Sequence, residues 1–421
     1  MARRVFTGRK QLILLFLAFS VIFIACEGKS NANAPVSFFD HVPSKPYNEN
    51  NMSLQPVSGK TAMEYFRDER IYSGINIGNS LDAFSGSRAN ETGWGNPPIS
   101  QELMNGIKSA GFDIVRIPVT WSGWFDNAPD YLINRYLLAR VAEVVNMANN
   151  AGLKAVINLH HDGAEGAGGV NWLSMNTALR STADYERVTF QFVQIWKQIA
   201  LYFKNYGDWL IFESCNEIHD GNWGNSNYAL LLPQFEILNK WNQFFTDTVR
   251  RSGGNNETRF LVIPGYVTNI RHTVGNNFVL PQDSVPGRLI VTFHYYDPYQ
   301  FGIEGSRSNW GTDADKKQVD DDFAQLSKFT DIGIPVVLGE CGAVLQLYPN
   351  DQAKEGIARQ SRFEYLPHIF ATAKKYGIVP IYWDNGATRG NGEKFGLFNR
   401  ITGQPNSEDS AALIKLMIDA V

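Results

Sequence analysis

The chain has 421 residues, which is enough for one large domain or for several small ones. Its 38 Lys and Arg residues nearly balance 42 Asp and Glu residues, and the formal net charge of −4 excludes a strongly basic protein, so we expect no nucleic-acid partner. Aromatic residues reach 13% and charged residues only 19%, a composition that excludes disorder for most of the chain.

The first 25 residues have the layout of a secretory signal peptide. Four basic residues precede an apolar run over residues 12–25 that only Ser20 interrupts. This run is shorter than the ~20 apolar residues that a membrane-spanning helix needs. Cys26 directly follows Phe-Ile-Ala, which resembles the lipid-attachment site of bacterial lipoproteins. We therefore expect an exported protein that touches the membrane only through a lipid on Cys26, at the bacterial cell surface or in the periplasm. An ordinary signal peptide cut nearby and an uncleaved anchor are the alternatives.

The segment over residues 26–59 is rich in Asn, Ser, Pro and Gly and poor in branched aliphatic residues. Such a composition is typical of a spacer, so we predict a tether between the lipid and the body of the protein. A strand or turn packed on the base of that body is the alternative. We expect residues 60–421 to form one domain, and the protein to be a monomer.

Short apolar, β-rich runs recur beyond residue 60, and each is followed by a longer stretch with helical periodicity. The predicted strands are 72–79, 114–119, 155–161, 210–217, 260–266, 289–296, 334–342 and 379–385. The helical stretches include 130–151, 184–206 and 355–376. Eight such repeats predict an α/β fold with a single closed (β/α)8 TIM barrel. An open doubly wound sheet is the alternative, but no glycine-rich phosphate turn follows the first strand.

Polar and aromatic side chains gather at the carboxyl ends of these runs. They are Asn79, Arg116, His160, His161, Asn216, Glu217, His294, Tyr296, Glu340, Trp383 and Asn385. The carboxyl ends of all strands of a barrel meet at one mouth, where barrel enzymes hold their catalytic residues. The sequence therefore predicts one site to which most of the strands contribute.

Two members of this set are carboxylates, Glu217 at the end of the fourth run and Glu340 at the end of the seventh. Paired carboxylates suit glycoside hydrolysis, in which one protonated group donates to the leaving oxygen and one ionised group attacks the anomeric carbon or activates water. Arg116 can favour the ionised form of one carboxylate, and His294 and Tyr296 can supply hydrogen bonds. Solvated salt bridges at the rim are the alternative interpretation of the two residues.

Nine segments in this order resemble the strand-end motifs of glycoside hydrolase family five: GINIGNSLDA, ETGWGNP, VRIPVTW, NLHHD, FESCNE, HYY, LGECG, YWDNG and FGLFNR. The resemblance extends from residue 65 to about residue 400 and is greatest to the fourth subfamily, which holds endo-β-glucanases and xyloglucan-active enzymes. It implies a retaining endo-β-1,4-glucanase that cleaves internal bonds of a β-glucan such as cellulose or xyloglucan, without metal or organic cofactor.

The resemblance also implies roles for single residues. Glu217 is then the general acid/base and Glu340 the nucleophile, while Arg116 and Tyr296 position the nucleophile and His294 contacts the acid/base. The residues implied to bind the sugar are Asn216 at the 2-hydroxyl, His160 and the stacking floor Trp383 in subsite −1, His161 in subsite −2, and Asn79 and Asn385 on the negative side. Turn capping is the alternative for Asn79 and Asn385.

The chain departs from the family at Ile218, where proline is usual after the acid/base. His219 and Asp220 then belong either to a positive subsite or to a surface loop. Tryptophans in the loops after the strands are candidate stacking platforms for pyranose rings. They are Trp94, Trp121, Trp124, Trp172, Trp223 and Trp310.

Rival functions remain open at this point. His160, His161 and Asp162 can begin a metal site, but adjacent histidines on a strand point to opposite sides, so we predict no metal. Cys215 and Cys341 lie on strands that are not neighbours, so we expect buried thiols, and a nucleophilic cysteine lacks a base. Specificity for xyloglucan, mixed-linkage glucan, mannan or xylan, and a non-catalytic glycan-binding surface protein, are the further alternatives.

Overall fold

The computed structural model describes residues 38–421. The predicted signal peptide, Cys26 and residues 27–37 of the predicted tether lie outside the described residues. Within residues 38–421, no helix is both long enough and apolar enough to cross a membrane.

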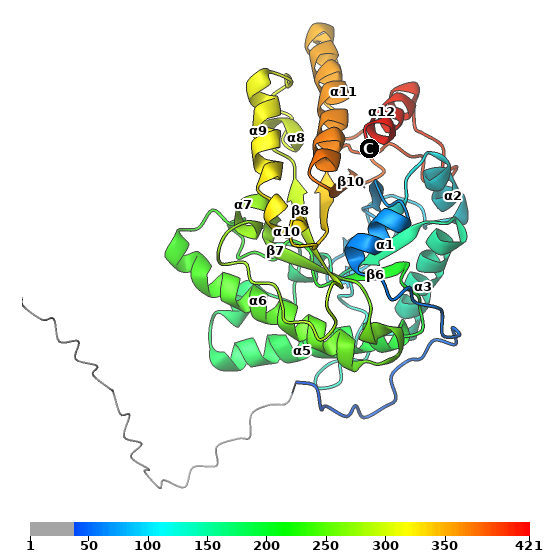
Figure 1. Ribbon diagram of the computed structural model, residues 1–421, viewed down its shortest axis with the longest axis vertical. Helices are drawn as coiled ribbons and strands as arrows, with labels where there is room; N and C mark the ends of the chain where they lie inside the picture. The colour runs from blue at the N-terminus through cyan, green and yellow to red at the C-terminus, as the bar shows by residue number, and fades with distance from the viewer. Residues whose placement is uncertain (1–37) are drawn as a thin grey trace, which may run out of the picture. The chain divides into compact units, whose positions relative to one another are not determined.

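Eight parallel strands close into a barrel (Figure 1). The strands are β1 (Gly74–Ile77), β4 (Ile114–Ile117), β5 (Lys154–Ile157), β6 (Leu210–Glu213), β7 (Leu261–Asn269), β8 (Leu289–Tyr295), β9 (Val336–Cys341) and β10 (Ile378–Asp384). The first strand pairs with both the second and the last, with Gly74 opposite Ile114 on one side and Ile381 on the other. The predicted (β/α)8 barrel is therefore confirmed, and the open doubly wound sheet is excluded. Each of the eight predicted runs overlaps one barrel strand. A short hairpin, β2 (Phe84–Ser85) with β3 (Arg88–Ala89), was not predicted.

Helices surround the barrel. They are α1 (Ala62–Asp68), α2 (Gln101–Ser109), α3 (Arg135–Asn150), α4 (Met175–Ala178), α5 (Thr182–Tyr202), α6 (Tyr228–Arg251), α7 (Ile270–Thr273), α8 (Tyr299–Gly302), α9 (Asp313–Ala324), α10 (Ser327–Thr330), α11 (Gln352–Lys375) and α12 (Glu408–Asp419). The three predicted helical stretches match α3, α5 and α11. Local sequence sets their starts: the side chains of Asn134, Ser181 and Asp351 each accept a hydrogen bond from a backbone N–H of the first turn.

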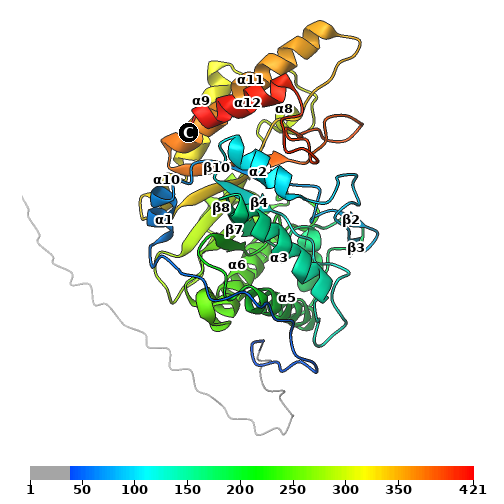
Figure 2. The same cartoon turned by 90° about the vertical axis from the view of Figure 1, so that its right-hand side faces the viewer.

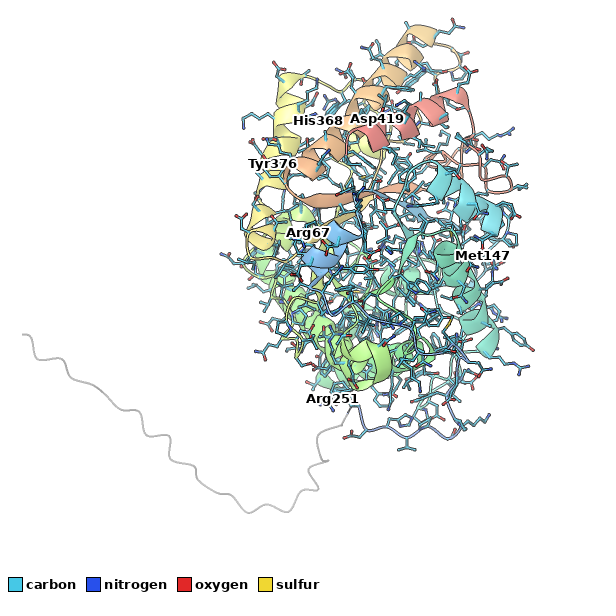
Figure 3. All side chains as sticks on the ribbon, turned by 45° about the vertical axis from the view of Figure 1, so that its right-hand side comes forward. Arg67, Met147, Arg251, His368, Tyr376 and Asp419 are labelled. Carbon is cyan, nitrogen blue, oxygen red and sulfur yellow. The ribbon has the colours of Figure 1, made fainter. Side chains whose placement is uncertain are left out.

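Two layers of apolar side chains hold the barrel together. One layer lies between strands and helices, where side chains fill the space between the two (Figure 3). The other contains residues from most of the strands, such as Ile114, Val156 and Ile211, together with Tyr65 and Phe66 of α1. Since α1 precedes the first strand and packs with this second layer, it closes the amino-terminal end of the barrel. Figure 2 shows α1 and the β2–β3 hairpin at opposite ends of the barrel.

The described part of the predicted tether, residues 38–59, packs against the barrel domain, so the tether prediction is wrong for these residues. Gln194 donates to the backbone oxygen of Phe38 at 2.8 Å, and the ring of Phe38 lies 5.0 Å from that of Phe244. Asn48 donates to the backbone oxygen of Ile133 at 2.8 Å. The polar composition suggested a solvated spacer, but Asn48 instead satisfies a backbone oxygen of the barrel domain and Asn50 donates to the Tyr206 hydroxyl at 2.9 Å. The alternative of a segment packed on the body holds for residues 38–59.

Candidate active site

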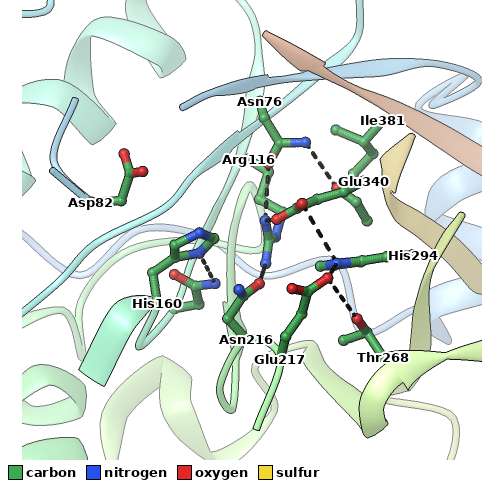
Figure 4. Close-up of polar contacts among 12 residues, drawn as sticks. Asn76, Asp82, Arg116, His160, Asn216, Glu217, Thr268, His294, Glu340 and Ile381 are labelled. Carbon is green, nitrogen blue, oxygen red and sulfur yellow. Dashed lines mark hydrogen bonds and ion pairs between the residues drawn. The ribbon is translucent and has the colours of Figure 1, made fainter. Parts of the chain in front are cut away.

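Strand alternation aims the polar residues into the mouth of the barrel. On β4, Ile114 packs in the inner layer, Val115 packs under the helices, and Arg116 again points inward, one level higher. The same alternation places Glu213 above Ile211 on β6. The inward-facing side chains are apolar near the amino-terminal ends of the strands and polar near their carboxyl ends. The polar side chains form one cluster at the mouth of the barrel (Figure 4).

Arg116 organises this cluster because all five of its N–H donors have an acceptor. Nε and Nη2 bind the two oxygens of Glu213 at 2.6 and 3.2 Å. Nη1 donates to Asn76 at 3.0 Å and to Glu340 Oε1 at 2.8 Å, and Nη2 also donates to Asn216 Oδ1 at 2.7 Å. The guanidinium is buried, so its position is fixed by these contacts.

Glu340 lies inside the barrel because β9 carries an irregularity directly before it. The register of β9 shifts against both neighbouring strands around Gly339. Such bulges re-aim side chains at the ends of strands. The oxygens of Glu340 then face two donors, since Oε1 accepts from Arg116 and Oε2 accepts from the Tyr296 hydroxyl at 3.0 Å. Both donors favour the ionised carboxylate.

Glu217 follows β6 and faces Glu340 across the mouth. Its Oε1 lies 2.6 Å from His294 Nδ1 and 3.3 Å from the Thr268 hydroxyl. One oxygen of Glu217, one oxygen of Glu340 and a nitrogen of His294 all lie within 4.8 Å of one another. In retaining glycosidases the carboxyl groups lie about 5–5.5 Å apart, whereas inverting enzymes need about 6.5–9.5 Å for a water. The separation fits direct attack on a sugar carbon held between the two groups.

Burial affects the two carboxyls alike, and their hydrogen bonds differ. Burial raises the pKa of Glu217, and Arg116 and His219 oppose that rise. Burial also raises the pKa of Glu340, and His294 and Arg116 act against it. Arg116 bonds directly to Glu340 and not to Glu217, so Glu340 is the better placed of the two to be ionised. Burial lowers the pKa of His294 to about 4, which leaves that imidazole neutral.

A flat platform lies at the bottom of the site. The rings of His160 and Trp383 are parallel within 5°, with centroids 5.8 Å apart. Trp383 is on the inner face of β10 and packs against Gly78, where an added Cβ would lie 2.7 Å from the indole. Glycine at position 78 is therefore required by the close approach of the indole. The structure brings together Trp383, the predicted stacking floor, and His160, which was predicted to line subsite −1.

The remaining predicted sugar ligands lie at the mouth with different surroundings. Asn79 has a positive φ of 56° and its backbone N–H bonds Asp82, so it forms part of the turn after β1. The amide of Asn385 bonds only backbone groups of its own loop, those of Ala387, Glu393 and Phe395. Turn capping, the alternative interpretation, is therefore what the structure favours for Asn385. A role of Asn385 in sugar binding stays a prediction.

Among residues 38–421, two groups of side chains are close enough to bind an ion. They are the trio Glu217, His294 and Glu340 described above and a second trio, Asp82, His160 and His161. The argument that the adjacent histidines point apart is wrong, because β5 ends at Ile157 and both rings lie beyond the pleat, 4.5 Å apart. Asp162 is turned away from them and accepts the indole N–H of Trp172 at 2.7 Å. We assign no metal, and its absence stays a prediction.

The structure shows the burial and the contacts of the loop tryptophans and of His219 and Asp220. Trp121 and Trp310 are buried and so are not platforms, whereas Trp94 and Trp223 are exposed by 40% and 53%. His219 is buried and stacks under Trp223 with ring centroids 4.0 Å apart. The Asp220 carboxylate bonds loop and helix groups, including Gln234 at 3.0 Å, which fits the surface-loop alternative.

The cysteines are as predicted. Cys215 and Cys341 are free and buried. Burial raises the pKa of both thiols, that of Cys215 to about 12. Neither thiol is suited to act as a nucleophile.

Sequence reasoning missed Glu213 and Asn76, which hold Arg116 in place. Both lie on the inner face of a strand, within sequence segments that are otherwise mostly apolar. The signal for Glu213 was a single carboxylate inside the buried run Leu-Ile-Phe-Glu, because a buried carboxylate needs a cationic partner. Side chains alternate along a strand, so Glu213, two positions after Ile211, lies on the same inner face of β6.

Comparisons with known proteins agree with this geometry. The sequence profile described as "Cellulase (glycosyl hydrolase family 5)" matches residues 76–389. Endoglucanase A of Paenibacillus barcinonensis is 39% identical over 349 residues, covering 78% of this chain and 83% of the relative. A xyloglucan-specific endo-β-1,4-glucanase of Bacteroides ovatus is 35% identical over 360 residues, covering 81% of this chain and 67% of the relative.

Solved structures are similar along most of the chain. A broad-specificity endoglucanase of family 5, subfamily 4, from Bacteroides salanitronis superposes with a TM-score of 0.79 at 41% identity, covering 89% of this chain and 99% of that structure. The Bacteroides ovatus family 5 xyloglucanase in complex with a heptasaccharide has a TM-score of 0.75 at 30% identity, covering 89% and 81%.

Proposed function

This chain belongs to glycosyl hydrolase family 5, the cellulase family, and from that premise we propose that Glu340 and Glu217 are the nucleophile and the general acid/base of its reaction. It is a glycoside hydrolase with a polysaccharide substrate, and endo-β-1,4-glucanase activity with retention of configuration is the function that its relatives and its site support. The observation that carries the proposal is the approach of a Glu217 oxygen to a Glu340 oxygen within 4.8 Å.

In the first step, a Glu340 oxygen attacks the anomeric carbon while the bond from that carbon to the glycosidic oxygen breaks. Glu217 gives its proton to the departing oxygen, and a glycosyl ester of Glu340 forms. In the second step, the Glu217 carboxylate takes a proton from water, whose oxygen attacks the same carbon and releases Glu340. Two inversions return the original configuration.

The neighbours of the two carboxylates make this sequence feasible. Arg116 and the Tyr296 hydroxyl hold Glu340 ionised and oriented before attack. As negative charge leaves Glu340, the Arg116 guanidinium keeps its bidentate contact with Glu213 and does not have to move. Asn216 uses its carbonyl oxygen on Arg116, which leaves its NH2 group to donate to a sugar hydroxyl. We propose that His160 and Trp383 form the floor on which that sugar lies.

Cleavage within chains, rather than at their ends, is supported by two exposed tryptophans in different loops at the mouth of the barrel, Trp94 and Trp223. Trp94 lies 5.4 Å from the ring of His161, in the loops after β1 and β5. Trp223 lies in the loop that follows Glu217, and its exposed indole rests on His219. Indole faces stack on pyranose rings. We propose that Trp94 serves the negative subsites and Trp223 the positive ones.

Cleavage of xyloglucan is the second candidate. A hollow of about 410 Å³ lies beside the mouth of the barrel and gives room for a sugar branch on the glucan backbone of the substrate. Its lining includes Tyr299, Gln346, Leu347, Tyr348 and Glu393, from the loops after β8, β9 and β10. Burial raises the pKa of Glu393, and the negative charge of Glu217 adds to that rise, which supports a position of the hollow near the acid/base.

One experiment tests both candidates. We expect digestion of defined cellulose and xyloglucan oligosaccharides to release internal fragments whose new reducing ends are first formed in the β-configuration, as followed by NMR spectroscopy and mass spectrometry. A first-formed α-anomer would contradict the nucleophile assignment. No cleavage of either substrate would contradict the glucanase proposal, and cleavage of unbranched chains alone would exclude the xyloglucan candidate.

We also propose that the protein is exported as a monomer and anchored by a lipid on Cys26. The support is the sequence of residues 1–26: basic residues, an apolar run, then Phe-Ile-Ala-Cys. Mass spectrometry of the protein expressed in a bacterium is expected to find an acylated amino-terminal Cys26, and a Cys26→Ala variant to lose the membrane fraction. An unmodified mature protein would contradict the anchor.

A further inference from the structure

His294 lies between the two carboxylates, and only one of its two ring nitrogens has a partner in the described residues. Nδ1 is 2.6 Å from Glu217 Oε1 and 3.6 Å from Glu340 Oε2. Nε2, on the other side of the ring, is buried and has no hydrogen-bond partner. An unpaired buried nitrogen costs about 1–3 kcal/mol, so a partner for Nε2 is expected.

The surroundings of Nδ1 favour a proton on that nitrogen. Nδ1 faces oxygens of two carboxyl groups, and Glu340 is held ionised by Arg116 and Tyr296. A lone pair on Nδ1 would be directed at the lone pairs of these oxygens, whereas an N–H would be attracted by them. The neutral ring therefore favours the form with its proton on Nδ1. Nε2 is then an acceptor that needs a donor.

Thr292 offers such a donor. It precedes His294 by two residues on β8, so both side chains point into the barrel. Its hydroxyl is also buried and also lacks a partner. The two atoms border the same spot beside β9: a Cβ added to Gly339 would lie 2.6 Å from Thr292 Oγ1 and 3.1 Å from His294 Nε2. The absence of a side chain at Gly339 lets both atoms lie at this point.

We propose that Thr292 is a positioning residue that fixes the tautomer of His294, its hydroxyl donating to Nε2 through one bridging water molecule. The proton of the imidazole then stays on Nδ1 and points at Glu217 Oε1. The acidic proton of Glu217 is thereby kept on the other oxygen, Oε2, free for the leaving group. Gly339 contributes to this arrangement in two ways. The bulge at Gly339 directs Glu340 into the barrel, and the absence of a side chain leaves room for the contact between Thr292 and His294.

The Nδ1–H bond also bears on the acidity of Glu217. A donor to Glu217 favours its ionised form and lowers its pKa. Without the Thr292 hydroxyl, the proton of His294 is free to move to Nε2, and Glu217 loses that donor. Other charged or titratable groups around the pair stay unchanged when Thr292 is replaced. These are Arg116 on β4, His160 and His161 after β5, Glu213 on β6, His219 after β6, Tyr296 after β8, Glu340 on β9 and Glu393 after β10.

The test compares Thr292→Val, which keeps the shape and removes the hydroxyl, with Thr292→Ser, which keeps the hydroxyl. We expect the alkaline limb of the pH profile of kcat/KM to move up by about half a pH unit to one unit in Thr292→Val, equivalent to about 0.7–1.4 kcal/mol. We expect Thr292→Ser to retain the position of the wild-type limb. If Thr292 only filled space, removing an unpaired hydroxyl would leave the limb in place.

A second measurement does not depend on catalysis. In the full-length wild-type protein, 15N NMR chemical shifts of His294 are expected to show a protonated Nδ1 and an unprotonated, hydrogen-bonded Nε2, and to lose this pattern in Thr292→Val. A protonated Nε2 in the wild type would overturn the proposal, as would an unchanged tautomer in Thr292→Val. The expected shift of the pH profile rests on the proposed function of Glu217 as the acid. The tautomer seen by NMR does not depend on that function. Failure of the proposed function and failure of this inference are therefore distinguishable.

Discussion

Arg116 and Glu213 meet beneath the two carboxylates of the site, with Arg116 Nε 2.6 Å from Glu213 Oε2 and Nη2 3.2 Å from Oε1. Both side chains are almost completely inaccessible to solvent. This pair fixes the guanidinium from below and leaves Nη1 to hold Glu340 from the side. The site therefore depends on a residue that does not itself face the sugar.

We expect Glu213→Ala to lower the free energy of unfolding by about 3–5 kcal/mol, because it leaves the buried charge of Arg116 without its bidentate partner. Chemical denaturation measures the change. The matched control is Glu143→Ala, which removes the exposed partner of Arg140 and should cost no more than about 1 kcal/mol. Equal losses in the two variants would show that Arg116 does not need Glu213.

Replacement of the two carboxylates should separate their roles. We expect Glu217→Ala and Glu340→Ala each to lower kcat/KM by about four orders of magnitude, because each removes one half of a pair that acts as a unit. Azide should rescue Glu340→Ala with a glycosyl azide of inverted configuration, and Glu217→Ala with one of retained configuration. Chromatography and NMR of the azide products decide the assignment, and exchanged outcomes would reverse it.

The pH profile follows from the raised pKa values of both carboxyls. Glu340 must be ionised, so its raised pKa moves the acid limb to higher pH than a glutamate with the ordinary pKa of about 4.3 would give. Glu217 must be protonated, so its raised pKa moves the alkaline limb in the same direction. Glu217→Gln, assayed on an aryl glycoside whose leaving group needs no proton, should lose the alkaline limb and retain the acid limb. Persistence of the alkaline limb would show that another group titrates there.

A substitution at Gly78 is expected to displace the Trp383 indole without replacing any polar residue of the site. Gly78→Ala places a Cβ 2.7 Å from the Trp383 indole, which must shift. We expect kcat/KM to fall about a hundredfold, since misplacements of 1 Å have effects of this size. Gly356→Ala, in α11 and with no neighbour within 4 Å, is the control and should not affect activity. A Gly78→Ala enzyme with normal kinetics would remove Trp383 from the proposed floor.

Removal of metal ions tests the trio Asp82, His160 and His161. We expect prolonged dialysis against a chelator to leave kcat and KM unchanged, because the proposed steps use only carboxyl groups and water. Metal analysis of the dialysed protein verifies the removal. Loss of activity that returns with a divalent cation would favour the metal-dependent alternative.

The sequence alone was sufficient to predict the eight strands, the barrel and most of the residues at its mouth. Strand and helix patterns are local, since they depend on the alternation of apolar residues and on capping residues within a few positions. The carboxyl ends of parallel strands must then meet, which brings Glu217 and Glu340 to one mouth although they are far apart in the chain. The resemblance to family five rested on the same strand ends, and the comparisons confirmed it.

Only the tertiary structure decided how the residues at the mouth use their hydrogen bonds. Arg116 could be placed near a carboxylate from sequence, but its pairing with Glu213 and Asn76 depends on the register of three strands. The irregularity at Gly339 and the docking of residues 38–59 also depend on neighbours distant in the chain. Such contacts are set by packing between elements, which local sequence patterns do not record, and so they became visible only in the folded barrel.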